Sequence, residues 1–140
     1  MLFNDKAGCA QCHLGNNFTD AQFHNLGVGW MKATKTFKDE GRWAISKDHG
    51  DIGRAGDRGA FKTPTLREVT KHAPYMHDGS IATLREVVEF YNRGGEQNPW
   101  LDPKVKPLNL TEAEIDALVA LMQALEGEGY QDTPPASFPQ

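Results

Sequence analysis

The stretch Cys9-Ala-Gln-Cys-His13 decides the fold class of this 140-residue chain. It is a C-x-x-C-H motif, in which the spacer on a helical turn matches the distance between the two vinyl groups of haem c. The two cysteines form thioethers with those vinyls, and the histidine that follows is the proximal iron ligand. The motif therefore predicts one covalent haem c, attached through Cys9 and Cys12 and ligated by His13.

Three other interpretations of the cysteine pair are weaker. A thioredoxin-like C-x-x-C follows a strand in a βαβ unit, and too few residues precede Cys9 for one. A structural zinc site needs four ligands, usually as two spaced pairs, so His24 or His49 would have to complete it. A disulfide across so short a spacer would be strained and would leave His13 without a role. Each alternative stays open but explains fewer residues than haem c does.

The composition is that of an ordinary globular domain. The chain has 15 Lys+Arg against 19 Asp+Glu, and its formal net charge of -4 argues against sequence-independent binding to nucleic acid or anionic membranes. The longest apolar run, Ala117–Met122, is far shorter than the roughly 18 residues of a membrane span. With 14 glycines and 8 prolines, we expect long loops and a modest core that packs around an apolar cofactor. Collagen, disordered, membrane-channel and disulfide-stapled proteins are excluded.

Covalent haem also predicts the compartment. Thioether attachment takes place where the apocytochrome is exported, so the motif predicts the bacterial periplasm or a similar oxidising space. The first residues carry neither a basic start nor a long apolar segment, and no signal peptide is visible. We therefore expect that an upstream segment has been removed and that Met1 is a start introduced for expression.

Three helices are expected, and they predict an all-α fold of the class I cytochrome c type. The first runs from about Met1 through Cys12 and delivers the haem ligands. The other two begin at capping boxes, Thr83-Leu-Arg-Glu86 and Thr111-Glu-Ala-Glu114, and carry apolar residues at helical spacing. Their apolar stripes are Leu84, Val87, Val88 and Tyr91 in the second helix, and Ile115, Leu118, Val119, Met122 and Leu125 in the third.

Glycine and proline predict where these helices end and where a shorter one begins. Gly94-Gly95 ends the second helix and Gly127 the third, because glycine readily adopts the left-handed conformation of a helix stop. A turn of helix at Thr65–Val69 follows Pro64, which is favourable in a first helical turn.

The remaining chain is expected to form long loops and a tail. Residues 15–59 are rich in glycine and polar residues and have no convincing period, and residues 94–110 carry three prolines. We predict a haem domain over residues 1–126 and an extended C-terminal tail over residues 127–140, since the proline-rich end of the chain cannot be helical.

Five segments of the chain match the motifs of one specific family. They are Ala7-Gly-Cys-Ala-Gln-Cys-His13, Phe23-His-Asn-Leu-Gly-Val28, Gly59-Ala-Phe-Lys-Thr-Pro-Thr-Leu-Arg67, Ala73-Pro-Tyr-Met-His-Asp-Gly-Ser80 and Thr83-Leu-Arg-Glu-Val-Val-Glu-Phe-Tyr-Asn-Arg-Gly-Gly95. Together these resemble the bacterial di-haem cytochrome c peroxidases and their MauG-like relatives, over about residues 1 to 126. Family members have two cytochrome c domains with one C-x-x-C-H each. This sequence has one such motif and resembles the C-terminal, electron-transferring half.

The residue at the sixth iron position decides the redox chemistry, because methionine raises the potential and an anionic ligand favours ferric iron. From the residues alone, Met76 ranks first, since it lies in the rigid loop Pro74-Tyr-Met-His77. Met122 belongs to an apolar stripe and is expected in the core. The resemblance implies Tyr91, because the family ligand lies fourteen residues past the loop histidine and the MauG-like branch has tyrosine there. We expect Tyr91, with Met76 as the alternative and an open or water-bound iron as the third option.

The resemblance also implies other features around the haem. It places His77 close to the haem, although a structural histidine is an equal interpretation. The family holds a calcium ion between its two domains, here by position partly through the carbonyls of His72 and Pro74. Because another calcium ligand comes from the other domain, we expect weak or no calcium binding by this chain alone.

Cations and tryptophans near these motifs have simpler alternatives. Lys62 and Arg67 flank the Thr-Pro-Thr-Leu segment and could pair with the haem propionates, but solvated surface charge is the simpler interpretation. Three tryptophans could carry electrons toward a partner, but ordinary packing is simpler for each: Trp30, Trp43 and Trp100.

The resemblance implies an electron-transfer role. Such a domain passes electrons between an external partner, a small redox protein or a protein substrate, and a peroxide-reacting haem in the second haem domain. Whether this chain alone is an enzyme stays open, because the peroxidatic half is absent from it. The alternative is a free-standing mono-haem cytochrome c without enzymatic activity, and a haem-based sensor with an exchangeable sixth site is the third. Neither nucleic acid nor a membrane span is expected.

Overall fold

Two capped helices form one side of the molecule, of which the computed structural model describes residues 1–49 and 54–127. Helix α2 spans Leu84–Asn92 and helix α3 spans Glu112–Gln123. Each begins at the predicted threonine, whose hydroxyl accepts the backbone N–H three residues later while the glutamate there reaches back. Both capping boxes are confirmed, because they depend only on residues close together in the chain.

The helix ends follow the glycines less uniformly. Gly94 and Gly95 have φ of 84° and 66°, a left-handed conformation that stops α2 as predicted. Helix α3 ends at Gln123, so the predicted end at Gly127 is wrong by one turn.

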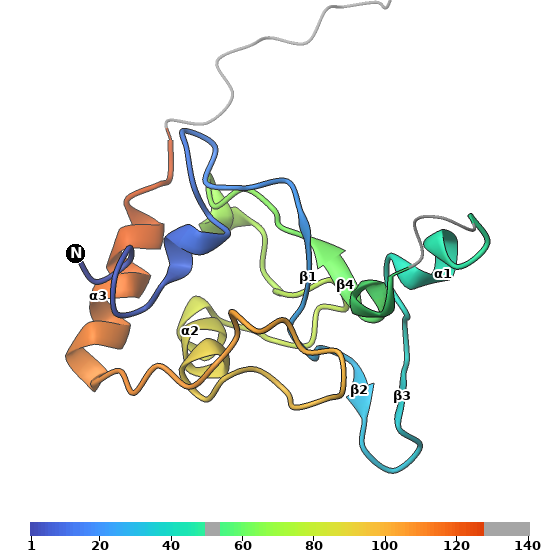
Figure 1. Ribbon diagram of the computed structural model, residues 1–140. Coiled ribbons are helices and arrows are strands. Elements are labelled where there is room, and N and C mark those ends of the chain that lie inside the picture. The colour runs from blue at the N-terminus through green and yellow to red at the C-terminus, as the bar shows by residue number, and fades with distance from the viewer. Residues whose placement is uncertain (50–53, 128–140) are drawn as a thin grey trace, which may run out of the picture.

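The hydrophobic core lies between α2 and α3 (Figure 1). Ile115, Leu118 and Met122 from α3 are buried, which confirms most of the predicted stripe. The N-terminal segment packs on the same core through Ala7, and Lys6 donates to the Glu114 carboxylate at 2.6 Å. The start of the chain, which carries the cysteines, is therefore fixed against α3.

The prediction of an all-α fold is wrong. Two small antiparallel ladders lie on the other side of the molecule, where β1 (Phe23–Asn25) pairs with β4 (Ala60–Lys62) and β2 (Trp30–Met31) pairs with β3 (Thr36–Phe37). Figure 1 shows the β2–β3 hairpin far from α3. Positive φ at Gly27 and Gly29 turns the chain between β1 and β2 and excludes a helix there. The long glycine-rich segment therefore forms extended pairs instead of a featureless loop.

The predicted N-terminal helix is also wrong. Residues 2–6 form turns, and a single 3₁₀ turn, η1 (Cys9–Gln11), carries the motif. Gly8 precedes it with φ of 62°, which breaks any continuous helix between the two parts. The helical turn expected at Thr65–Val69 is displaced to η3 (Val69–Lys71). The short elements left are α1 (Trp43–Ser46) and η2 (Ala55–Asp57).

Asn25 joins β1 to the loop of residues 94–110. It is 1% exposed, its side-chain amide donates to the Arg58 carbonyl at 2.6 Å, and it also bonds Asn98. Its own carbonyl accepts the backbone N–H of Asp102 at 3.0 Å. These hydrogen bonds pair the buried side-chain amide and backbone carbonyl of Asn25. Asn25 therefore fixes the loop of residues 94–110 where it borders the site described below.

The predicted tail lies, apart from Gly127, outside the described residues. Within residues 1–49 and 54–127, no helix is long and apolar enough to cross a membrane.

Loss of the α3 cap is expected to destabilise the fold measurably. Thr111→Ala removes a hydroxyl that accepts the Glu114 N–H, and such a loss costs about 1 kcal/mol of the free energy of unfolding. Urea unfolding of the haem-loaded chain checks this, with Thr34→Ala in the exposed β2–β3 loop as the control. An equal loss of unfolding free energy in both variants would show that the cap does not stabilise the fold specifically.

Candidate functional site

A cavity of about 650 Å³ lies between the helical core and the β1–β4 ladder. Both cysteines and the histidine of the C-x-x-C-H motif line it, and so do Leu84, Val88 and Leu118 of the helices. Val28, Phe61 and Leu108 contribute apolar wall from other segments. An apolar pocket of this size with a few polar groups is the usual form of a cofactor site.

The His13 ring is held with one nitrogen paired and the other available. Its Nδ1 lies 2.8 Å from the Phe18 carbonyl oxygen, so Nδ1–H donates there and Nε2 carries the free lone pair. Burial lowers the pKa of His13, although the Phe18 carbonyl opposes the shift, and this favours the neutral imidazole that a metal requires. Such a paired second nitrogen is how proteins orient a ligating histidine.

The two thiols of the motif are not joined in a disulfide. Burial raises the pKa of the Cys9 thiol to about 11, and burial likewise raises the pKa of Cys12. The disulfide interpretation therefore finds no support, and neither sulfur is a ready thiolate for a metal. The two thiols and His13 face one apolar cavity, and this set of donors fits a covalently attached haem c.

Both candidates for the sixth position line the same cavity. Tyr91 is in the last turn of α2, and Met76 is in the loop before α2 with φ of 70°. Burial raises the pKa of Tyr91 well above its usual range, and the neighbouring Cys12 and Cys9 add to the shift. The structure thus brings Tyr91, Met76 and His13 to one site without choosing between the first two.

Other predicted residues divide between the cavity and the surface. Lys62 and His77 line the cavity, and the His77 ring stacks on Phe61 with centroids 3.5 Å apart. Arg67 does not line it, since its Nε donates to the Asn16 carbonyl and its guanidinium lies over Phe18. His72 and Pro74, the expected calcium residues, are on the cavity wall, while Met122 is buried in the core as expected and also reaches it.

None of the three tryptophans lines the cavity, and two of them pack on each other. Trp30 and Trp100 have ring centroids 5.9 Å apart, and the Arg58 guanidinium lies 4.8 Å from the rings of both Trp43 and Trp100. Packing, the simpler interpretation, accounts for all of these contacts.

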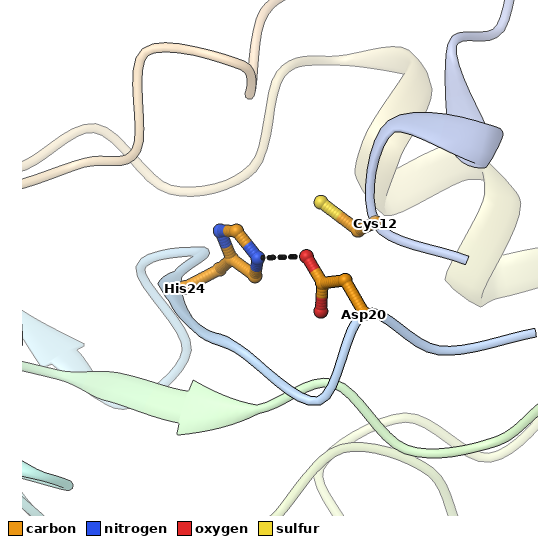
Figure 2. Close-up of side chains that lie close together, drawn as sticks. All are labelled: Cys12, Asp20 and His24. Carbon is orange, nitrogen blue, oxygen red and sulfur yellow. Dashed lines mark hydrogen bonds and ion pairs between the residues drawn. The ribbon is translucent and has the colours of Figure 1, made fainter. Parts of the chain in front are cut away.

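A cluster of charged groups beside Cys12 is the part of the site that the sequence did not reveal. Figure 2 shows Asp20, His24 and Cys12 facing one another, with ligand atoms within 4.8 Å. His24 Nε2 lies 2.8 Å from Asp20 and its Nδ1 lies 2.6 Å from Asp102. Burial tends to raise the pKa of Asp20, but hydrogen bonds from the Gln22 N–H and His24 hold it at about 2.

This cluster is a poor zinc site. Both ring nitrogens of His24 already face carboxylates, so neither lone pair is free for an ion. Cys9 is not in the cluster, and neither is His49, so the four ligands that the zinc interpretation requires do not assemble in the described residues. Residue spacing could not have revealed the contact with Asp102, because it joins positions 78 residues apart.

The geometry of the cavity agrees with what the whole sequence matches. The family model for cytochrome c matches residues 2–126. The chain belongs to the cytochrome c family. Membership implies covalent haem c, and it explains why a 3₁₀ turn and the two residues after it bring two cysteines and a histidine to an apolar cavity.

Relatives include named peroxidases and MauG proteins, which confirms the resemblance stated above. Cytochrome-c peroxidase IdrP1 of Denitromonas iodatirespirans is 41% identical over 143 residues, covering 89% of this chain and 38% of the relative. Methylamine utilization protein MauG of Methylorubrum extorquens is 39% identical over 127 residues, covering 91% of this chain and 33% of the relative. This chain therefore spans well under half the length of these relatives.

A solved structure has the same fold. The crystal structure of a MauG-like protein associated with microbial copper homeostasis superposes with a TM-score of 0.79 at 27% identity. The match covers 91% of this chain and 45% of that protein. The small strands and short helices described above are thus compatible with the cytochrome c-like domain of a MauG-like protein.

Proposed function

We propose that this chain is a haem c electron-transfer domain of a di-haem cytochrome c peroxidase or MauG-like oxidoreductase. The observation that carries the proposal is the 650 Å³ cavity, which both motif thiols and the oriented His13 line. Relatives named as peroxidases and MauG proteins support the finer assignment. The periplasm is the proposed compartment, because thioether attachment takes place after export.

Different residues of the chain have different proposed roles in holding haem c. Cys9 and Cys12 are the proposed anchors, where each S–H would add across one vinyl double bond, the sulfur to one carbon and the hydrogen to the other. His13 is the proposed proximal ligand through Nε2, with its ring fixed by the Phe18 carbonyl. Tyr91 is the proposed sixth ligand, with Met76 as the alternative. The bound haem supplies one-electron redox chemistry, and the apolar side chains exclude water from it.

The proposed partners follow from the role of a domain within a larger enzyme. The electrons pass between an external small redox protein or protein substrate and a peroxide-reacting haem in a second domain. This chain contains one C-x-x-C-H, so peroxide chemistry is proposed for that second domain. Calcium is proposed only where the second domain adds ligands to the His72 and Pro74 carbonyls. A free-standing mono-haem carrier is the alternative.

Slow reaction with peroxide is the expected behaviour of the isolated haem-loaded chain. Its sixth position is filled by a protein side chain, so hydrogen peroxide, azide and carbon monoxide have no open iron to bind. The measurement is peroxide turnover with a reduced donor, together with difference spectra after adding azide to the ferric form. Reversible one-electron reduction with neither effect supports the proposal.

The opposite outcome is equally clear. Turnover at the rate of an intact peroxidase, or tight azide binding, would show an exchangeable sixth site. The sensor or enzyme interpretation would then replace the electron-transfer role.

A further inference from the structure

His24 is enclosed by acceptors on both sides of its ring. Nε2 lies 2.8 Å from an Asp20 oxygen and Nδ1 lies 2.6 Å from an Asp102 oxygen. The three side chains are between 11% and 17% exposed, so water competes little for these contacts. Asp20 and His24 follow the haem motif, whereas Asp102 belongs to the loop of residues 94–110. The imidazole therefore joins two walls of the site.

Counting protons fixes the charge of this trio. Each nitrogen–oxygen contact needs one proton, because an ionised carboxylate only accepts and the ring nitrogen opposite must donate. Two carboxylates bring two negative charges, and the doubly protonated imidazole brings one positive charge. Moving a proton from the ring to a carboxylate leaves that sum unchanged. The trio thus carries one net negative charge wherever its two protons lie.

The trio lies at the edge of the cavity and next to a proposed haem anchor. His24 and Asp102 line the cavity, and the Asp20 and His24 ligand atoms are within 4.8 Å of the Cys12 sulfur (Figure 2). Three lysines also line the cavity, and one of them, Lys104 on the same loop as Asp102, donates to the Gln11 carbonyl at 3.3 Å; the other two are Lys62 and Lys106. A partly buried charge is weakly screened, so it would act on a haem held in this cavity.

We propose that His24, Asp20 and Asp102 form a positioning trio that holds one negative charge beside the haem and thereby lowers its reduction potential. The inference rests on the proposed haem c function and goes beyond it. Negative charge stabilises ferric over ferrous iron, because reduction adds an electron to the same region. The trio acts through charge and does not touch the iron.

Substitutions within the trio are expected to shift the potential in opposite directions. Asp102→Asn and Asp20→Asn each remove one negative charge while keeping side-chain shape, so the midpoint potential rises. His24→Gln removes the positive charge and leaves two carboxylates, so the potential falls. The measurement is spectroelectrochemical titration of the haem-loaded chain. The ferric absorption spectrum stays unchanged, because both axial ligands remain.

The control and the contrary outcomes separate charge from packing. Asp116→Asn removes the same charge from the exposed face of α3, where Arg85 pairs with it, and is expected to leave the potential unchanged. Shifts of the midpoint potential in the same direction in all three trio variants would mean that disturbed packing, and not charge, changes the potential. Shifts no larger than that of the control would mean that the trio has no effect on the potential. Either result overturns this inference alone. Failure of the wild-type chain to hold haem covalently would overturn the proposed function together with it.

Discussion

Tyr91→Phe is expected to convert the whole ferric population to a five-coordinate or water-bound form. A phenolate at the sixth position stabilises ferric iron, so its removal changes the ferric optical and EPR spectra and raises the reduction potential. Free tyrosine has a pKa near 10, and burial raises the pKa of Tyr91 further. Deprotonation at neutral pH therefore has to come from the positive charge of the metal, as it does for metal-bound water and thiols.

Met76→Leu is the matched control for this substitution. Both residues line the same cavity, and the change keeps an apolar side chain of similar size in the loop before α2. We expect its ferric spectrum to be nearly that of the wild type. A sulfur-to-iron charge-transfer band in the wild type that disappears in Met76→Leu would instead identify Met76 as the ligand, and the MauG-like assignment of Tyr91 would be wrong.

Removal of the two anchors has the second large expected effect. The double substitution Cys9→Ala, Cys12→Ala deletes both thioethers, so acid-acetone extraction is expected to remove all haem from the chain. Cys12→Ala alone leaves one thioether and one intact vinyl group, which the pyridine haemochrome spectrum reports as a red shift. Cys9 is the more buried thiol, with a pKa raised to about 11, so its contacts within the apolar wall are lost as well.

His77→Ala provides the comparison for those variants. His77 lines the cavity without belonging to the C-x-x-C-H motif, and its ring stacks on Phe61. We expect its haem to resist extraction as in the wild type. Haem that stays attached in the double cysteine variant would show that the anchors have been assigned wrongly.

Local signals in the sequence predicted local structure well. The capping boxes at Thr83 and Thr111 lie within four residues each, and both helices begin there. The haem motif depends on a similarly short spacing, and its three residues do line one cavity. Gly8 shows the limit of this approach, because its left-handed φ of 62° divides a segment that was expected to form one helix.

Residue patterns could not predict contacts between segments that are distant in the sequence. Strands β1 and β4 pair Phe23 with Lys62, and no period marks such short strands as extended. The contact of His24 with Asp102 could not be predicted, since the two residues lie 78 positions apart in the sequence. The all-α prediction was wrong and the trio was not predicted for the same reason. Both the strand pairs and the trio depend on tertiary contacts between distant segments.

The mass of the intact wild-type chain under denaturing conditions tests the central claim most directly. Covalent haem c through Cys9 and Cys12 predicts a single species heavier than the 140-residue polypeptide by one haem, with no free thiol to alkylate. A chain of unmodified mass with two reactive thiols, obtained from cells that attach haem c to other proteins, would contradict the account.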